Sequence, residues 1–130
     1  VTFSINSKVN IVSLDDVAEV ADKIIGNNSH FYTTYQLAGP EMLSAIDKAE
    51  ILSSVLNRKI KALEESISDF ETGAINNKID ENIIKTRIKM FSHYNRMGLH
   101  ANPNVHSWIL NRSPTNFENF VKKYKNMFEK

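Results

Sequence analysis

The chain has 130 residues, a formal net charge of +1 and no cysteine, with 42% hydrophobic and 24% charged residues. This balance is typical of one globular domain or of a piece of a larger one. The small net charge argues against binding to nucleic acid or to an anionic membrane, and the lack of cysteine excludes disulfides, thiolate metal sites and a cysteine nucleophile. No apolar run approaches the ~20 residues of a membrane span and no secretory signal is evident, so we expect a cytoplasmic protein.

The first quarter of the chain predicts two strands and a helix. Alternating apolar residues indicate strands at Val1–Ile5 and Val9–Val12. Ser13 then stands at a helix start with Asp16 three residues later, and an apolar stripe continues to Ile25. Asp16 has two interpretations: a carboxylate that caps the helix, which the spacing favours, or a functional side chain.

The middle of the chain predicts a strand, a turn, a helix and a further strand. Tyr35–Ala38 alternates apolar and polar side chains and is followed by a Gly-Pro break. Ser44 and Asp47 have the spacing of a capping box. The helix that they begin ends at Asn57, and Ile60–Leu63 is the next predicted strand.

The second half predicts mainly helices. Ser66 starts a short helix that Gly73 and Asn76-Asn77 break, and Asp80 starts a longer helix that runs to Met97. One or two helical turns at 104–110 carry the only tryptophan. The last helix has a predicted N-cap at position 115, with a glutamate three residues later that completes a capping box.

Two blocks of residues carry a family resemblance. The first consists of Leu37, Gly39, Pro40, Glu41, Ala49, Ile51, Leu52, Ser53, Leu56 and Arg58, and the second of Arg112, Pro114, Thr115, Phe117, Glu118 and Phe120. Together with Asp16-Val17-Ala18, they resemble segments of NmrA-like proteins, which are atypical NAD(P)-binding relatives of the short-chain dehydrogenases/reductases. Asn57 and Asn111 stand where the family usually has Gly, and Asn116 stands where it has Ser.

The resemblance implies an α/β fold, the C-terminal portion of a Rossmann-type NAD(P)-binding protein. We expect a single segment, 1–130, with strand–helix units in 1–65 and a mainly helical lobe in 66–130, about five helices in all. The resemblance further implies that the N-terminal dinucleotide-binding half lies outside this chain, so NAD(P)(H) is bound mainly by residues elsewhere and no cofactor-binding residue is assigned here.

Chemical signatures within the chain are few. There is no Gly-rich dinucleotide loop and no Tyr-x-x-x-Lys pair. The histidine spacing does not suit a metal site. In the related family the late helices wall the substrate cleft, so the helix at Ile83–Met97 is predicted as a pocket wall, with plain core as an equal alternative. The predicted substrate-binding residues are Tyr94, His93, His100 and Trp108.

Three functions remain open at this point. The first is the substrate lobe of an NAD(P)-dependent oxidoreductase acting on a small carbonyl or quinone-type compound. The second is a non-catalytic protein that senses NADP(H) and binds a protein partner. The third is a truncated product without a ligand, whose open sheet edge would favour self-association.

Overall fold

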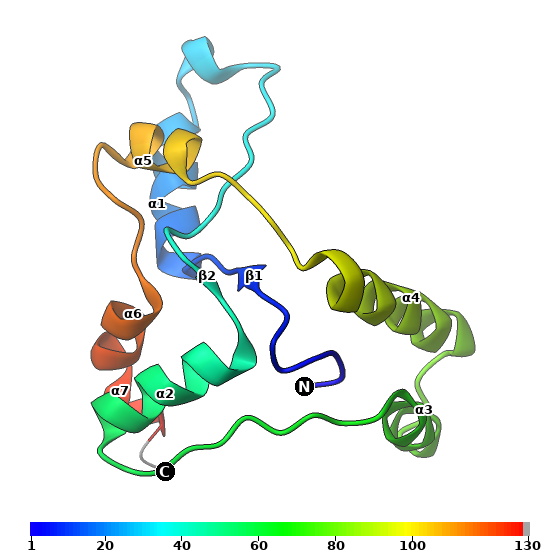
Figure 1. Cartoon of the computed structure of the whole chain (residues 1–130). Coiled ribbons are helices and arrows are strands. Elements are labelled where there is room, and N and C mark those ends of the chain that lie inside the picture. The colour runs from blue at the N-terminus through cyan, green and yellow to red at the C-terminus, as the bar shows by residue number, and fades with distance from the viewer. Residues whose placement is uncertain (129–130) are drawn as a thin grey trace.

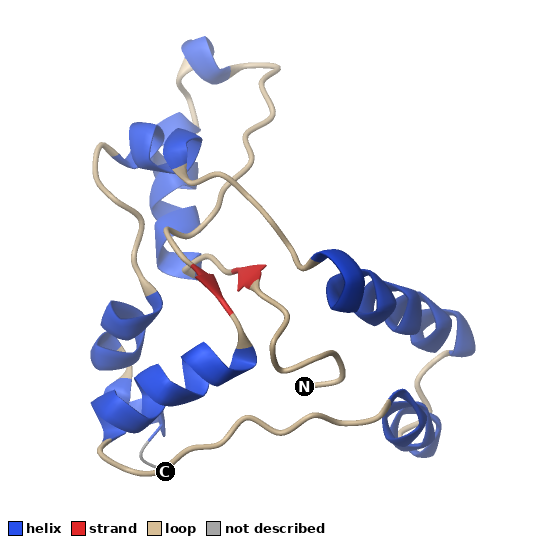
Figure 2. Cartoon of the chain, in the orientation of Figure 1, coloured by secondary structure: helices blue, strands red, loops and turns tan. Residues whose placement is uncertain are grey.

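The computed structural model describes residues 1–128, which form seven α-helices, a 3-10 turn and two short strands. In chain order the elements are β1 (Val9–Asn10), α1 (Leu14–Ile24), η1 (Asn28–His30), β2 (Met42–Leu43), α2 (Ala45–Leu56), α3 (Ile67–Asn76), α4 (Glu81–Met97), α5 (Asn104–Leu110), α6 (Phe117–Lys123) and α7 (Lys125–Phe128). Figures 1 and 2 show the helices arranged around the two strands.

The strands join three segments that are far apart in the sequence. β1 and β2 pair antiparallel, with Val9 opposite Leu43 and Asn10 opposite Met42. Val9 also forms a parallel bridge with Leu99, where Asn10 N donates to Leu99 O at 2.8 Å. The predicted second strand is therefore confirmed over two residues.

The other three predicted strands are wrong, because Val1–Ile5, Tyr35–Ala38 and Ile60–Leu63 are irregular. Alternation of apolar residues defines a face, but a strand also needs a neighbouring backbone for its hydrogen bonds. In the described structure, the Ala38 carbonyl accepts instead from the side chain of His106, whose Nδ1 lies 2.8 Å away.

The helix starts confirm part of the capping predictions. Ser44 Oγ accepts from Asp47 N at 3.1 Å, and Asp47 Oδ2 accepts from Ser44 N at 2.8 Å, so the capping box of α2 is present. The capping of α1 was predicted wrongly, since the side chain of Ser13 makes no cap hydrogen bond. Asp16 has other partners, described below.

Two helices differ in part from the prediction. α3 ends at Asn76, which confirms the predicted break at Asn76-Asn77, but it passes through Gly73, because a glycine inside a helix costs only about 1 kcal/mol. α6 is capped by Asn116, whose side chain accepts from Asn119 N at 2.8 Å, and not by Thr115. α4 begins after Asp80 as predicted.

The core lies where the helices pack in pairs: α2 with α6, α1 with α5 and α3 with α4. The buried apolar side chains are Val9, Val20, Ala38, Ala45, Ala49, Leu56, Ala74, Ile84, Leu110 and Val121. Ile25, which was predicted on the buried stripe of α1, is 78% exposed because it follows the helix in an extended conformation.

The α3–α4 pair stands apart from the other helices, on the right in Figure 1. Ile84 is the one buried residue of α4, while Ile83, Met90 and Met97 are exposed. None of the helices in residues 1–128 combines the length and apolar character that a membrane span requires.

Candidate functional site

The two segments that carry the family resemblance meet beside the strands, at the turn Gly39-Pro40-Glu41. Phe117 N, at the start of α6, donates to Glu41 Oε2 at 3.1 Å. The side chain of Asn10 holds the other side of the turn: its amide nitrogen donates to Gly39 O at 3.0 Å and to Glu41 O at 3.2 Å, and its oxygen accepts from Gly39 N at 2.9 Å. The turn is thus fixed between β1 and α6.

Gly39 is required by the close approach of the segment that follows β1. A Cβ atom at this position would lie 1.9 Å from Ile11 O, well inside contact distance. Glycine therefore lets two backbone segments come together under the turn.

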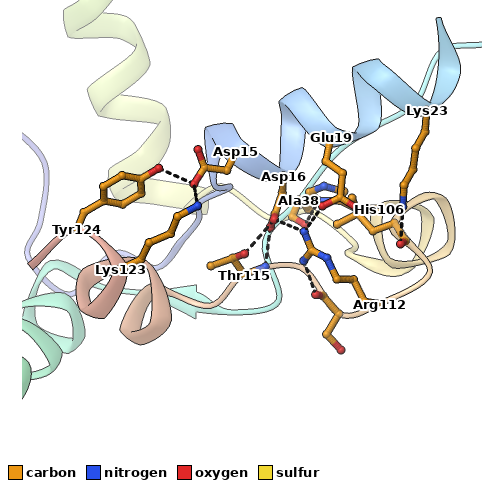
Figure 3. A network of polar contacts seen from close by, with 12 residues as sticks. Asp15, Asp16, Glu19, Lys23, Ala38, His106, Arg112, Thr115, Lys123 and Tyr124 are labelled. Carbon is orange, nitrogen blue, oxygen red and sulfur yellow. Dashed lines mark hydrogen bonds and ion pairs between the residues drawn. The ribbon is translucent and has the colours of Figure 1, made fainter.

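A buried carboxylate joins α1 to the second block (Figure 3). Asp16 is 1% exposed and accepts from Arg112 at 2.8 Å, from Thr115 N at 2.6 Å and from Thr115 Oγ1 at 2.9 Å. Arg112 also donates to Glu19. In the same helical turn, Asp15 accepts from Lys123 and Tyr124 of the C-terminal helical region.

The electrostatics of Asp16 follow from these contacts. Burial alone would raise the pKa of the Asp16 carboxyl, but its hydrogen bonds with Arg112 and Thr115 outweigh burial and hold the pKa below its ordinary value. Asp16 is therefore an ionised structural anchor, since its bonds to Arg112 and Thr115 tie α1 to the second block.

A pocket of about 90 Å³ opens between this turn and the start of α6. It has mostly apolar walls with Glu41 at one side, and a more polar depression beside Arg112 adjoins it. The residues that line the pocket are Ile11, Val12, Ser13, Pro40, Glu41, Thr115, Asn116, Phe117 and Phe120. The pocket suits a small apolar group, but its described lining offers no histidine, lysine or tyrosine for proton transfer.

Two of the predicted substrate-binding residues lie together on α4. The rings of His93 and Tyr94 are 6.2 Å apart, and Tyr94 packs edge-on against Phe3 at 5.5 Å. His93 also lines a shallow surface depression with Lys89 and Arg96.

The other two predicted residues lie elsewhere. Trp108, on α5, is 65% exposed, and its ring lies 6.3 Å from His30 and 6.4 Å from Tyr35. His100 is exposed in the connection between α4 and α5. Because α5, which carries Trp108, packs on α1 while α4 stands on the other side of the strands, Trp108 lies apart from His93 and Tyr94 (Figure 1).

Sequence reasoning gave no role to His106, the most buried large side chain of the described core. Its Nδ1 donates to Ala38 O at 2.8 Å, which leaves Nε2 as a buried nitrogen without a hydrogen-bond partner. The sequence carries no signal for this role beyond a histidine within the short predicted helix at 104–110. In residues 1–128 no three histidine, aspartate or glutamate side chains are grouped so that they could hold a metal ion.

The chain was compared with known proteins. No family model matches it. Two curated relatives from Penicillium roqueforti (strain FM164) are festuclavine synthase I, 39% identical over 64 residues, and festuclavine synthase II, 38% identical over 60 residues. These matches span 49% and 46% of the chain but only 22% and 21% of the relatives.

Solved structures match nearly the whole chain. The Citrobacter sp. triphenylmethane reductase complexed with NADP(H) has a TM-score of 0.72 at 18% identity, covering 95% of this chain and 43% of the reductase. The NADPH-dependent quinone oxidoreductase QOR2 of Escherichia coli has a TM-score of 0.74 at 17% identity. The match covers 95% of this chain and 46% of the oxidoreductase. A nucleoside-diphosphate-sugar epimerase from Staphylococcus aureus has a TM-score of 0.71 at 22% identity. The match covers 90% of this chain and 40% of the epimerase.

The chain therefore has the fold of the C-terminal part of Rossmann-type NAD(P)-dependent reductases and spans less than half of their length. The predicted resemblance to NmrA-like proteins is confirmed at the level of the fold.

Proposed function

We propose that this chain is the substrate-lobe part of an NAD(P)-dependent oxidoreductase that acts on a small carbonyl or quinone-type compound. The observation that carries the proposal is the similarity in fold, over 95% of the chain, to two reductases whose names include NADP(H) or NADPH. Since the chain has no Gly-rich phosphate-binding loop, we place most of the dinucleotide contacts outside it.

Within this proposal the chain contributes substrate contacts and no cofactor site. His93 and Tyr94 are the pair that we place nearest the substrate, because a tyrosine hydroxyl or an imidazole N–H can donate to a carbonyl oxygen. His100 and Trp108 remain proposed contacts, but one small substrate is not expected to touch both Trp108 on α5 and the pair on α4, because these two helices lie apart (Figure 1).

A specific observation favours a second candidate, an NADP(H)-sensing protein that binds a protein partner. Phe31, Tyr32 and Trp108 are large aromatic side chains that are 55%, 107% and 65% exposed. Exposed aromatic residues are enriched in protein–protein interfaces, where they bury large areas.

The test uses the longest naturally expressed polypeptide that contains residues 1–130. It is mixed with NADPH, and cofactor binding is followed by nicotinamide fluorescence while turnover of a quinone or an aldehyde is followed by nicotinamide absorbance. Turnover supports the oxidoreductase, and binding without turnover supports the sensor. Absence of both would contradict the two candidates.

A substitution pair then tests the proposed role of Tyr94. Loss of one hydrogen bond to the substrate in Tyr94→Phe should lower kcat/KM about tenfold, the equivalent of about 1.4 kcal/mol. Tyr124→Phe is the matched control, because the Tyr124 hydroxyl is bonded to Asp15. Equal effects of both substitutions would remove Tyr94 from the proposed substrate site.

A further inference from the structure

Lys48 lies in an apolar groove on α2. The groove has a volume of about 270 Å³ and runs between α2 and the irregular segment that follows it. Lys48 is half-buried there, on the same face of the helix as Ala45, Ala49 and Leu52. The opposite wall is formed by Ile60, Ala62 and Leu63, and Val1 closes one side.

The ammonium group of Lys48 has no anionic partner among the described residues. The adjacent Asp47 is bonded to Ser44 in the capping box. In the facing segment, Glu64 accepts from Ile5 N at 3.2 Å and Glu65 accepts from Thr2 Oγ1 at 2.8 Å.

Lys61 is the other charged side chain that lines the groove, and it lies exposed at the rim. By contrast, the side chains of Lys23, Lys85, Lys122 and Lys123 each form an ion pair with a carboxylate.

An amine in this position differs chemically from an exposed one. Burial without a counter-charge penalises the ammonium form and lowers the pKa of Lys48. A larger fraction of neutral amine is then present near pH 7, and the neutral amine is the nucleophile that attacks carbonyl groups. Lysines that are desolvated in apolar pockets are used in this way by enzymes that form Schiff bases.

We propose that Lys48 is a reactive amine that captures a small aldehyde with an apolar body and forms an imine in this groove. Neutral Nζ attacks the carbonyl carbon, the C–N bond forms as the C=O π bond opens, and one proton passes from the nitrogen to the oxygen to give a carbinolamine. Loss of water forms the C=N bond, so that amine and aldehyde give imine and water, without an oxidant or a reductant. The apolar walls hold the aryl or alkyl part of the aldehyde, and the inference does not rest on the proposed function.

The test labels the intact protein with benzaldehyde in the presence of sodium cyanoborohydride, which reduces an imine to a stable secondary amine. Peptide mapping by mass spectrometry then gives the labelling rate of each lysine. We expect Lys48 to be labelled several times faster than Lys59 and Lys89, which are exposed. Labelling of Lys48 no faster than that of these two lysines would overturn the proposal.

Two controls distinguish the effect of the groove on labelling from the intrinsic reactivity of the Lys48 amine. Formaldehyde has no apolar body, so the preference for Lys48 over Lys59 should be smaller with formaldehyde than with benzaldehyde; an equal preference would overturn the role of the groove. In urea the preference should disappear, because the groove is lost on unfolding. If the preference for Lys48 persisted in urea, it would come from the neighbouring residues in the sequence and not from the groove. That result would also overturn the proposal.

Discussion

Two neighbouring aspartates in the first turn of α1 have different surroundings. Asp16 is 1% exposed with three hydrogen bonds, whereas Asp15 lies at the surface. Asp16→Asn removes the charge that pairs with Arg112. It also places an amide N–H₂, itself a donor, against the hydrogen-bond donors of Arg112 and Thr115. We expect a loss of about 2–4 kcal/mol in the free energy of unfolding, measured by urea denaturation.

The matched control for this prediction is Asp15→Asn. Asp15 contacts Lys123 and Tyr124 near the surface, where water screens the interaction. We expect a much smaller loss of stability than in Asp16→Asn. Similar losses in the two variants would contradict the assignment of Asp16 as a buried anchor.

Asp16 also predicts how stability responds to acid. Although burial alone would raise the pKa of this carboxyl, its hydrogen bonds leave the folded-state pKa below the unfolded value of about 3.9. As pH falls, the unfolded chain therefore takes up the proton first. The contribution of Asp16 is present in full above about pH 5, begins to fall near the unfolded-state pKa, and is lost as pH falls through the folded-state pKa.

The measurement is the pH dependence of unfolding below neutral pH. The difference in stability between the native protein and Asp16→Asn should be constant from pH 7 to about 5 and should shrink at lower pH. A difference that grows on acidification would mean that the folded-state pKa is raised.

Two glycines give opposite predictions for the same substitution to alanine. At Gly39 a Cβ atom would lie 1.9 Å from Ile11 O, so Gly39→Ala must displace backbone and should destabilise by several kcal/mol. At Gly73, inside α3, the Cβ atom would meet nothing within 4 Å. Gly73→Ala should therefore raise the midpoint of thermal unfolding, with a gain of about 0.5–1 kcal/mol.

At the scale of whole elements, helices could be predicted from the sequence better than strands. The ends of α2 and α4 follow from local features, such as the capping box at Ser44 and the side chain of Asp80. The prediction failed at Ser13 and Thr115 because Asp16, which the spacing places in a local cap, bonds instead to residues about 100 positions away. Such a long-range partner leaves no periodic signal in one sequence.

The N-cap serines of α1 and α2 test this distinction. Ser44→Ala removes a cap hydrogen bond and should cost about 1 kcal/mol. Ser13 Oγ is buried without a partner, so Ser13→Ala should leave the free energy of unfolding unchanged or raise it slightly. Equal losses in the two variants, measured by chemical denaturation, would mean that Ser13 caps α1 after all.

At the scale of the whole molecule, the fold class could be predicted from the two blocks of residues that resemble a known family. Which residues come together in space to form a site could not be predicted from the sequence. Leu37–Glu41 and Arg112–Phe120 were each recognisable, but their meeting at the Gly39-Pro40-Glu41 turn depends on Asn10, which is an ordinary residue in a strand pattern. The four predicted substrate residues were chosen by chemical type. Chemical type does not encode distance, and the fold places α5, which carries Trp108, apart from the pair on α4 (Figure 1).

The α3–α4 pair is joined to the rest of the molecule mainly through the N-terminal segment. Phe3 packs against Phe91 at 6.3 Å and Tyr94 at 5.5 Å, and Ser4 N donates to Asn95 Oδ1 at 2.6 Å. With Ile84 as the one buried residue of α4, few interactions resist local opening. We therefore expect α3 and α4 to exchange amide hydrogens before α1 and α2 do.

Phe3→Ala should weaken this connection selectively. Loss of two aromatic contacts removes about 1–2 kcal/mol, which corresponds to roughly 5- to 30-fold faster exchange in α4. The exchange of α2 should stay unchanged, since α2 packs on α6. Phe31→Ala, in an exposed loop, is the control and should change neither helix. Faster exchange of α2 and α4 together would indicate that Phe3 belongs to the common core, and the two parts would then unfold as a single cooperative unit.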